Sequence, residues 1–232
     1  MARKQITNNP PRRRAHRQAG RRYLIVCEGE TEKTYFRWVR DMLNEKTIVI
    51  RSTTGSSPDQ VAVALEAVQQ GMPDERRGLF PYDEVWAVFD WDERTDRVEQ
   101  AKKVLEDANK AAKKKDYSVS FNMGLSNPLF EIWFLWHLTD YQATGCLGND
   151  VLRATRKQCP EYVKGSGIPT SRLKGQYQRA YDRAVKAAKS HQRDGRTFPE
   201  DRPRSDVADL MDSIVTSWRR FRGIAPTGPS PL

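Results

Sequence analysis

Short apolar runs alternate with longer segments of helical periodicity over the first part of the chain. The apolar runs predict strands at residues 23–27, 47–51, 85–89 and 117–121. Apolar positions spaced three or four residues apart predict helices between them, at residues 31–43, 59–70 and 98–115. This alternation is typical of an α/β fold with a parallel sheet, and the unbroken apolar runs indicate strands buried on both faces.

The second part of the chain is predicted to be helical. Residues 126–139 are apolar almost throughout, which predicts a buried helix with Asn127 as its N-cap and Pro128 at its first position. Residues 140–173 have little periodicity, and two further helices are predicted at 175–192 and 205–221. We therefore expect one domain over residues 22–222, helical from about residue 140, followed by a flexible tail at 223–232.

Positive charge is concentrated at the N-terminus. The chain has 232 residues and a net charge of +10, but residues 1–22 hold eight of the 40 Lys and Arg and no acid. The other 210 residues therefore carry 32 basic and 30 acidic side chains, or +2. We expect a disordered tail at residues 1–21. Either it binds nucleic-acid phosphates or it is a solubilising or partner-binding tail, and the candidate phosphate contacts are Arg12, Arg13, Arg14 and Arg17.

Composition argues against a membrane protein or a secreted one. The sequence contains no run of 18 apolar residues and no apolar segment behind its N-terminal charges. The three cysteines lack the paired spacing of a zinc site, and their odd number suits a reducing compartment. We expect a cytoplasmic protein with no membrane partner.

Carboxylates follow two of the predicted strands at the point where each strand ends. Glu28 follows the strand at 23–27, and Asp90 and Asp92 follow the strand at 85–89. The carboxyl ends of parallel strands share one edge of a sheet, which is where ligands bind in open α/β folds. Hard oxygen donors in this number predict Mg²⁺ or Mn²⁺ and chemistry on phosphate esters. The alternative is that these acids only cap the helices that follow.

Other residues near these acids are candidates for supporting roles. Gly29 allows a tight turn beside Glu28, and Glu32 adds a further carboxylate to that turn. Glu131 lies inside the apolar helix, where a charge must be paired or bind metal, so we expect it either at the same sheet edge or in a salt bridge with Lys or Arg. His137, later in that helix, is expected to be a hydrogen-bonded core or rim residue.

Three motifs, in this order, resemble the RloB family. They are Cys27-Glu28-Gly29-Glu30-Thr31-Glu32, then residues 82–93 around Asp90, and then residues 126–137 around Glu131. The resemblance implies a Toprim-like Rossmannoid fold with a mainly parallel four-stranded sheet, flanked by helices and followed by C-terminal helices. It also implies a place in prokaryotic restriction-modification and abortive-infection loci, with an AAA-type ATPase as partner.

The resemblance also implies roles for individual residues. Glu28 would be a general acid/base or a metal ligand, and Asp90 and Asp92 would be the metal-binding pair. Residues 162–165 resemble a tyrosine-x-lysine element of the family, in which Lys164 would stabilise negative charge on the reacting phosphate. Lys174 competes with Lys164 for this role.

The leading hypothesis is a Mg²⁺- or Mn²⁺-dependent nuclease that hydrolyses DNA or RNA. A haloacid-dehalogenase-type phosphatase also has an Asp-x-Asp strand end, but Thr95 lies one position too late for that motif. The non-enzyme alternative is a catalytically silent or partner-activated nucleic-acid-binding subunit that works with an ATPase. The sequence is compatible with either a monomer or a homo-oligomer.

Overall fold

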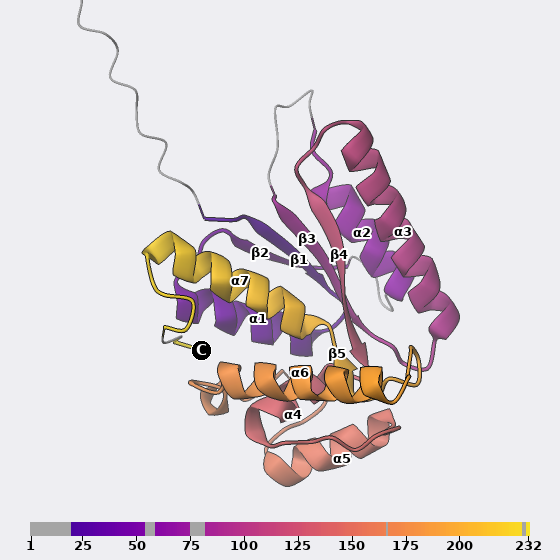
Figure 1. The fold of residues 1–232 in the computed structure, drawn as a ribbon, viewed down its shortest axis with the longest axis vertical. Helices are drawn as coiled ribbons and strands as arrows, with labels where there is room; N and C mark the ends of the chain where they lie inside the picture. The colour runs from indigo at the N-terminus through magenta and orange to yellow at the C-terminus, as the bar shows by residue number, and fades with distance from the viewer. Residues whose placement is uncertain (1–19, 54–58, 75–81, 166, 229–230) are drawn as a thin grey trace, which may run out of the picture.

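A five-stranded mixed sheet forms the centre of the molecule (Figure 1). The computed structural model describes residues 20–53, 59–74, 82–165, 167–228 and 231–232. The strand order is β2-β1-β3-β4-β5, and the first four strands are parallel while β5 is antiparallel to β4. The strands are β1 (Tyr23–Cys27), β2 (Ile48–Ser52), β3 (Glu84–Asp90), β4 (Ser120–Asn127) and β5 (Arg204–Ser205).

Helices cover both faces of this sheet and its lower end. Figure 1 shows α2 and α3 on one face, α1 and α7 on the other, and α4, α5 and α6 below the carboxyl ends of the strands. The α-helices of the described residues are α1 (Glu30–Leu43), α2 (Gln60–Gly71), α3 (Thr95–Lys114), α4 (Glu131–Leu138), α5 (Gly148–Gln158), α6 (Tyr177–Arg193) and α7 (Val207–Arg222). A short 3₁₀ turn, η2 (Thr170–Arg172), lies between α5 and α6.

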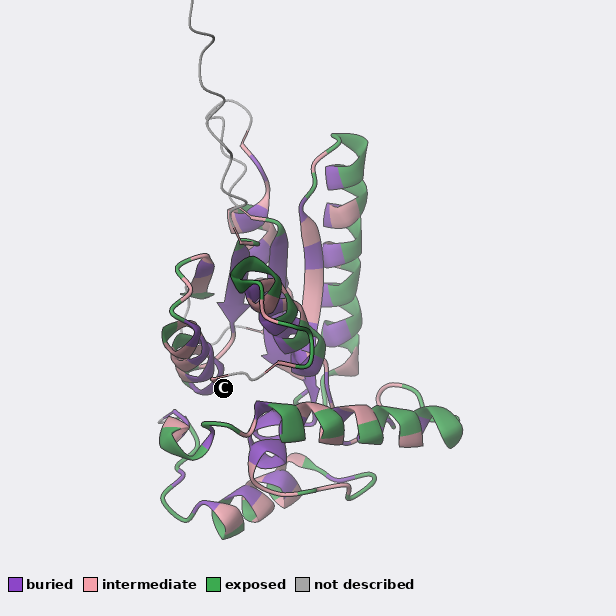
Figure 2. Ribbon diagram, turned by 60° about the vertical axis from the view of Figure 1, so that its left-hand side comes forward, coloured by how far each residue is buried: buried purple, intermediate pink, exposed green. Residues whose placement is uncertain are grey.

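The alternation of side chains along each strand produces two hydrophobic cores. In β1, Leu24 and Val26 pack with α2 and α3, whereas Ile25 and Cys27 pack with α1, α4, α6 and α7. Both sets are buried, and Figure 2 shows the central strands buried along most of their length. This two-sided burial explains why the strands read as unbroken apolar runs and confirms the predicted α/β class.

The predicted number of four strands is wrong, because β5 adds a fifth. β5 has two residues, which is too short for a periodic pattern, and it forms only where it pairs with Ser126 and Asn127. The fourth strand was also placed too early, at 117–121. It runs from Ser120 to Asn127 because its polar end is buried between β3 and β5.

Two helix predictions also need correction. Asn127 is not the N-cap of α4: it is the last residue of β4, and its side chain donates to the Pro199 carbonyl and to Asp201, each at 3.0 Å. Phe130 is the N-cap instead. α5 lies within the stretch that appeared non-periodic, because only Val151 and Thr155 are buried among its residues.

The predicted buried helix is confirmed as α4, whose residues Glu131 to His137 are all buried. It packs on α5 and α6 at the lower end of the molecule. Leu232, at the end of the chain, is also buried, and the flexibility of residues 223–232 stays a prediction. No helix in the described ranges is both long and apolar enough to cross a bilayer.

Candidate functional site

Glu28 and Asp90 lie side by side at the carboxyl edge of the sheet. β1 and β3 are parallel neighbours with Cys27 opposite Val88, and the Glu28 N–H donates to the Val88 carbonyl at 3.0 Å. The Asp90 N–H then donates to Glu28 Oε2 at 3.3 Å. A hydrogen bond thus joins two acidic residues that follow separate apolar runs in the sequence.

The Asp90 side chain meets the start of α4. The Phe130 N–H donates to Asp90 Oδ1 at 2.7 Å, and Glu131 is the first residue of the helix. The free N–H groups and the dipole at a helix N-terminus favour a neighbouring negative charge. This junction brings Glu131 to the same edge as Asp90, close enough for its charge to raise the pKa of Asp90.

Glu131 is held by Tyr162 rather than by a basic residue. Its side chain is almost fully buried, and the Tyr162 hydroxyl donates to Glu131 Oε1. Among the described residues, no Lys or Arg forms a salt bridge with Glu131. Within these residues, the expectation that Glu131 pairs with a basic side chain is therefore wrong. Tyr162 was not identified as part of the site from the sequence, although it begins the tyrosine-x-lysine element.

Glu32 is the fourth acid of the site, and Gly29 makes room for it. Gly29 is the N-cap of α1, and Glu32, three residues later, is 4% exposed. Burial raises the pKa of Glu32, while the neighbouring backbone N–H groups of Glu32 and Gly29 lower it. A Cβ on Gly29 would lie 2.8 Å from Glu32 Oε2. A side chain at position 29 would therefore require the Glu32 carboxylate to shift.

These four acids, Glu28, Glu32, Asp90 and Glu131, form what we call the carboxylate cluster. Burial raises the pKa of Glu28 to about 7, against the hydrogen bond from Asp90. Burial, followed by the charges of Glu131 and Glu28, raises the pKa of Glu32 to about 8. The pKa of Asp90 is raised well above its usual range by burial and then by the other three acids. The surroundings of the cluster therefore do not compensate the charge that full ionisation of these acids would create.

Asp92 lies at the rim of the cluster. β3 ends at Asp90, so Asp92 lies beyond the strand and does not share the alternation of its side chains. Asp92 is exposed and has a left-handed backbone with φ of 47°. Its charge still contributes to the raised pKa values of Glu28 and Asp90. Asp92 is thus near the cluster without being buried in it.

The donor chemistry of the cluster fits a hard divalent cation. All the donors are carboxylate oxygens, and no Lys or Arg of the described residues forms a salt bridge with any of the four acids. Within the same residues, no three Asp, Glu, His or Cys side chains already converge as a metal site does. Hydrogen bonds to Phe130, Tyr162 and the Asp90 N–H hold these oxygens instead. Metal binding would have to replace some of these bonds.

Lys164 is exposed to solvent, whereas His137 is buried. Lys164 lies two residues beyond Tyr162, in the loop after α5. His137 is 1% exposed, its ring packs edge-on against Tyr35 and Trp133, and its Nδ1 donates to the Trp133 carbonyl at 2.9 Å. Burial lowers the pKa of His137 to about 4, so it is neutral near pH 7. His137 is therefore a core residue, as expected from the sequence.

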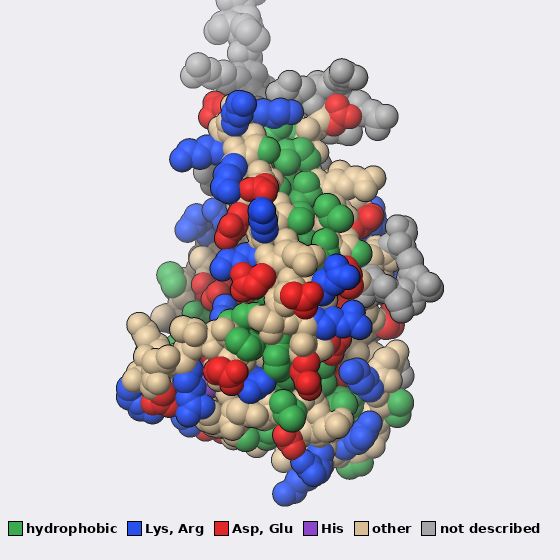
Figure 3. All heavy atoms as spheres, turned by 90° about the vertical axis from the view of Figure 1, so that its right-hand side faces the viewer, with side chains coloured by type: hydrophobic (Ala, Val, Ile, Leu, Met, Phe, Trp, Pro, Cys, Tyr) green, Lys and Arg blue, Asp and Glu red, His purple; other side chains and the backbone are tan. Residues whose placement is uncertain are grey.

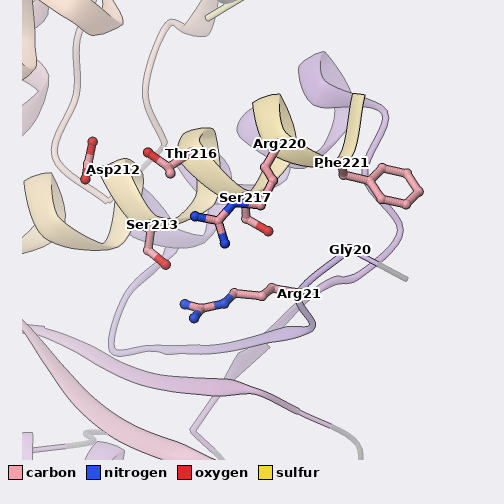
Figure 4. Close-up of a pocket in the computed structure, with 8 residues that line it drawn as sticks. All are labelled: Gly20, Arg21, Asp212, Ser213, Thr216, Ser217, Arg220 and Phe221. Carbon is pink, nitrogen blue, oxygen red and sulfur yellow. The ribbon is translucent and has the colours of Figure 1, made fainter. Parts of the chain in front are cut away.

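A cavity of about 370 Å³ lies at the opposite, amino edge of the sheet, between α7 and the start of β1 (Figure 4). Figure 4 shows Arg220 coming from α7 and Arg21 from the segment before β1. Arg21 pairs with Glu84, which also accepts a hydrogen bond from Ser213 at 2.8 Å. These contacts tie α7 to the sheet, so we interpret the cavity as part of a structural junction. The candidate phosphate contacts Arg12, Arg13, Arg14 and Arg17 lie outside the described residues.

The motifs around Glu28, Asp90 and Glu131 thus meet in one place, and a family model spans them. The model described as RloB-like protein matches residues 23–214. The chain belongs to the RloB-like family. The matched range runs from the first residue of β1 into α7 and includes the whole carboxylate cluster. No curated protein and no solved structure matches the chain.

Proposed function

We propose that this RloB-like protein is a metal-dependent nuclease that hydrolyses phosphodiester bonds. The observation that carries the proposal is the carboxylate cluster: four acids from β1, α1, β3 and α4 gathered at the carboxyl edge of a mainly parallel sheet. Ionising four acids this close together is costly unless a cation offsets their charge. Perturbed pKa values of this kind are also typical of catalytic sites.

Each acid has a role in this proposal that follows from its surroundings. Asp90 and Glu131 would bind Mg²⁺ or Mn²⁺, with Asp92 contributing from the exposed rim. When bound, the ion would supply charge neutralisation at the phosphate and a more acidic water. Glu28, with a pKa of about 7, would take up or release a proton near neutral pH, as a general acid/base must. Glu32 would orient the turn at Gly29.

The family resemblance extends the proposal beyond the site. It favours a Toprim-like variant of the α/β fold and a role in prokaryotic anti-phage defence by abortive infection. It also favours a cytoplasmic location and an AAA-type ATPase as a partner. The site supports the reaction class, and these wider roles rest on the resemblance.

Cleavage assays on the full chain test the reaction. Supercoiled plasmid and total RNA are incubated with Mg²⁺, with Mn²⁺ or with chelator, using wild type, Glu28→Gln, Asp90→Asn and the exposed-site control Glu99→Gln. We expect metal-dependent cleavage that falls by on the order of 100-fold in the first two variants, as general acid/base or ligand loss does, and is unchanged in the control. Equal background cleavage by all four proteins would refute the proposal that the chain is a nuclease without a partner.

A partner-activated subunit is the second candidate. In its favour, the oxygens of Glu28, Asp90 and Glu131 are engaged in hydrogen bonds within the chain. An ATPase partner would then convert this arrangement into a metal-binding one. Cleavage that appears only when the partner is added would support this candidate over the first.

A further inference from the structure

The segment that contains α5 and η2 has a net positive charge. Residues 147–176, all described except 166, contain six Lys or Arg and two Asp or Glu, a net charge of +4. Residues 23–232 as a whole carry +2, so those outside this segment sum to −2. We call residues 147–176 the α5 segment.

The two acids of the α5 segment are already paired, which leaves its other cations available. Asp150 pairs with Arg153 one turn later in α5, and Glu161 pairs with Arg172 at 2.8 Å. The four remaining cations are exposed, and none has a salt-bridge partner among the described residues. They are Arg156, Lys157, Lys164 and Lys174.

The α5 segment adjoins the carboxylate cluster. Tyr162, between α5 and η2, is buried and donates to Glu131 in the cluster. α5 itself packs on α4, which begins with Glu131, and Figure 1 shows α5 at the lower end of the molecule, toward which β1, β3 and β4 point. The cations and the cluster therefore occupy the same end of the protein.

A simpler explanation for Arg156 and Lys157 is that cations in the last turn stabilise a helix dipole. α3 offers a comparison, because Lys113 and Lys114 occupy its last turn in the same way. However, α3 ends near the amino edge of the sheet, and Figure 3 shows acidic and basic side chains interleaved over the face it shares with α2. The dipole accounts for two of the cations in the α5 segment and does not explain Lys164 or Lys174.

We propose that the α5 segment is the surface that binds the phosphate backbone of nucleic acid and directs it to the carboxylate cluster. The inference rests on the proposed nuclease function, and it specifies where the folded domain contacts its substrate. Unpaired Arg and Lys side chains bind phosphates independently of base sequence. Such a surface also offsets the repulsion between the cluster and a polyanion.

Binding is measured by fluorescence anisotropy with the full chain, using duplex DNA and single-stranded RNA in chelator so that no cleavage occurs. The test variant is Arg156→Glu with Lys157→Glu, and the matched control is Lys113→Glu with Lys114→Glu. We expect at least about tenfold weaker binding for the α5 variant and a salt dependence reduced by about two phosphate contacts. The α3 control should bind like wild type, and the affected probe identifies DNA or RNA as the ligand.

Equal affinity of the α5 variant and wild type for both probes would overturn the inference. An equal loss in the α3 control would do the same, because net charge alone would then explain binding. Circular dichroism verifies that each variant is folded, and Lys164→Glu with Lys174→Glu provides an independent second variant. If the α5 variants lose binding while wild type never cleaves, the binding surface is supported and the nuclease proposal fails separately.

Discussion

At the scale of single residues, Tyr162 connects the C-terminal part of the chain to the carboxylate cluster. Its hydroxyl donates to Glu131, 31 positions earlier in the sequence. The charge of Glu131 and that of Asp90 both raise the pKa of Tyr162, after burial, so the hydroxyl stays protonated and remains a donor. The buried Glu131 side chain thus has a hydrogen-bond donor although it has no salt bridge among the described residues.

Tyr162→Phe removes this donor while keeping the ring. We expect the free energy of unfolding, measured by urea denaturation, to fall by about 1 to 3 kcal/mol, because the buried Glu131 side chain loses its hydrogen-bond donor. Tyr35→Phe is the control: its hydroxyl is buried and has no hydrogen-bond partner among the described residues, so its removal should cost little. Similar losses in the two variants would contradict the importance of the Tyr162 contact.

At the scale of elements, β4 has an edge that β5 covers only in part. β5 pairs with Ser126 and Asn127. Earlier in the strand, the Asn109 side chain of α3 takes the place of a neighbouring strand: it donates to the Phe121 carbonyl at 2.7 Å and accepts from the Phe121 N–H at 2.8 Å. An open strand edge favours aggregation, so this side chain protects the sheet as well as fastening α3 to it.

Asn109→Ala should therefore destabilise the domain. We expect a loss of about 1 to 3 kcal/mol in unfolding free energy, together with faster hydrogen exchange at the Phe121 amide, because two backbone groups lose their partner. Asn122→Ala, also half-buried, removes only longer hydrogen bonds of 3.1 to 3.5 Å and should cost less. An unchanged Phe121 amide in Asn109→Ala would show that the edge is protected in another way.

At the scale of the whole molecule, the carboxylate cluster links stability to pH. The pKa values of Glu28 and Glu32, about 7 and about 8, lie above the ordinary value of 4.5. Between pH 4.5 and 8, the folded protein therefore holds protons that the unfolded chain has released. Stability then falls as pH rises through this range, because the state with more bound protons is favoured at low pH.

We expect metal-free protein to lose unfolding free energy between pH 5 and 8, with Glu28 contributing on the order of 1 to 3 kcal/mol. Thermal or urea denaturation in chelator measures the loss, and Glu28→Gln should flatten the curve while the exposed-site control Glu99→Gln leaves it unchanged. Added Mn²⁺ should stabilise the wild type more at pH 8 than at pH 5, since it competes with protons for the same oxygens. A pH profile identical in wild type and Glu28→Gln would refute this linkage.

Local sequence patterns identified the buried strands β1 and β3 and the longer helices that have a clear apolar face. The strand at 23–27 was predicted with its observed ends. The helix predicted at 59–70 is α2, which begins one residue later, since Asp59 is its N-cap and accepts from the Ala62 N–H at 2.9 Å. The same patterns failed for β5, with two residues, and for α5, with few buried positions. A short or mostly exposed element has too few apolar positions to produce a recognisable period.

The sequence by itself placed Glu28 and Asp90 at one edge of an α/β sheet, because the ends of apolar strands can be recognised locally, and it left Glu131 either at that edge or in a salt bridge. Only the tertiary structure decided how these acids are held. The bond from the Asp90 N–H to Glu28 spans 62 residues, and the bond from Tyr162 to Glu131 spans 31. Neither follows from a local pattern, because each depends on how strands and helices pack around the two cores.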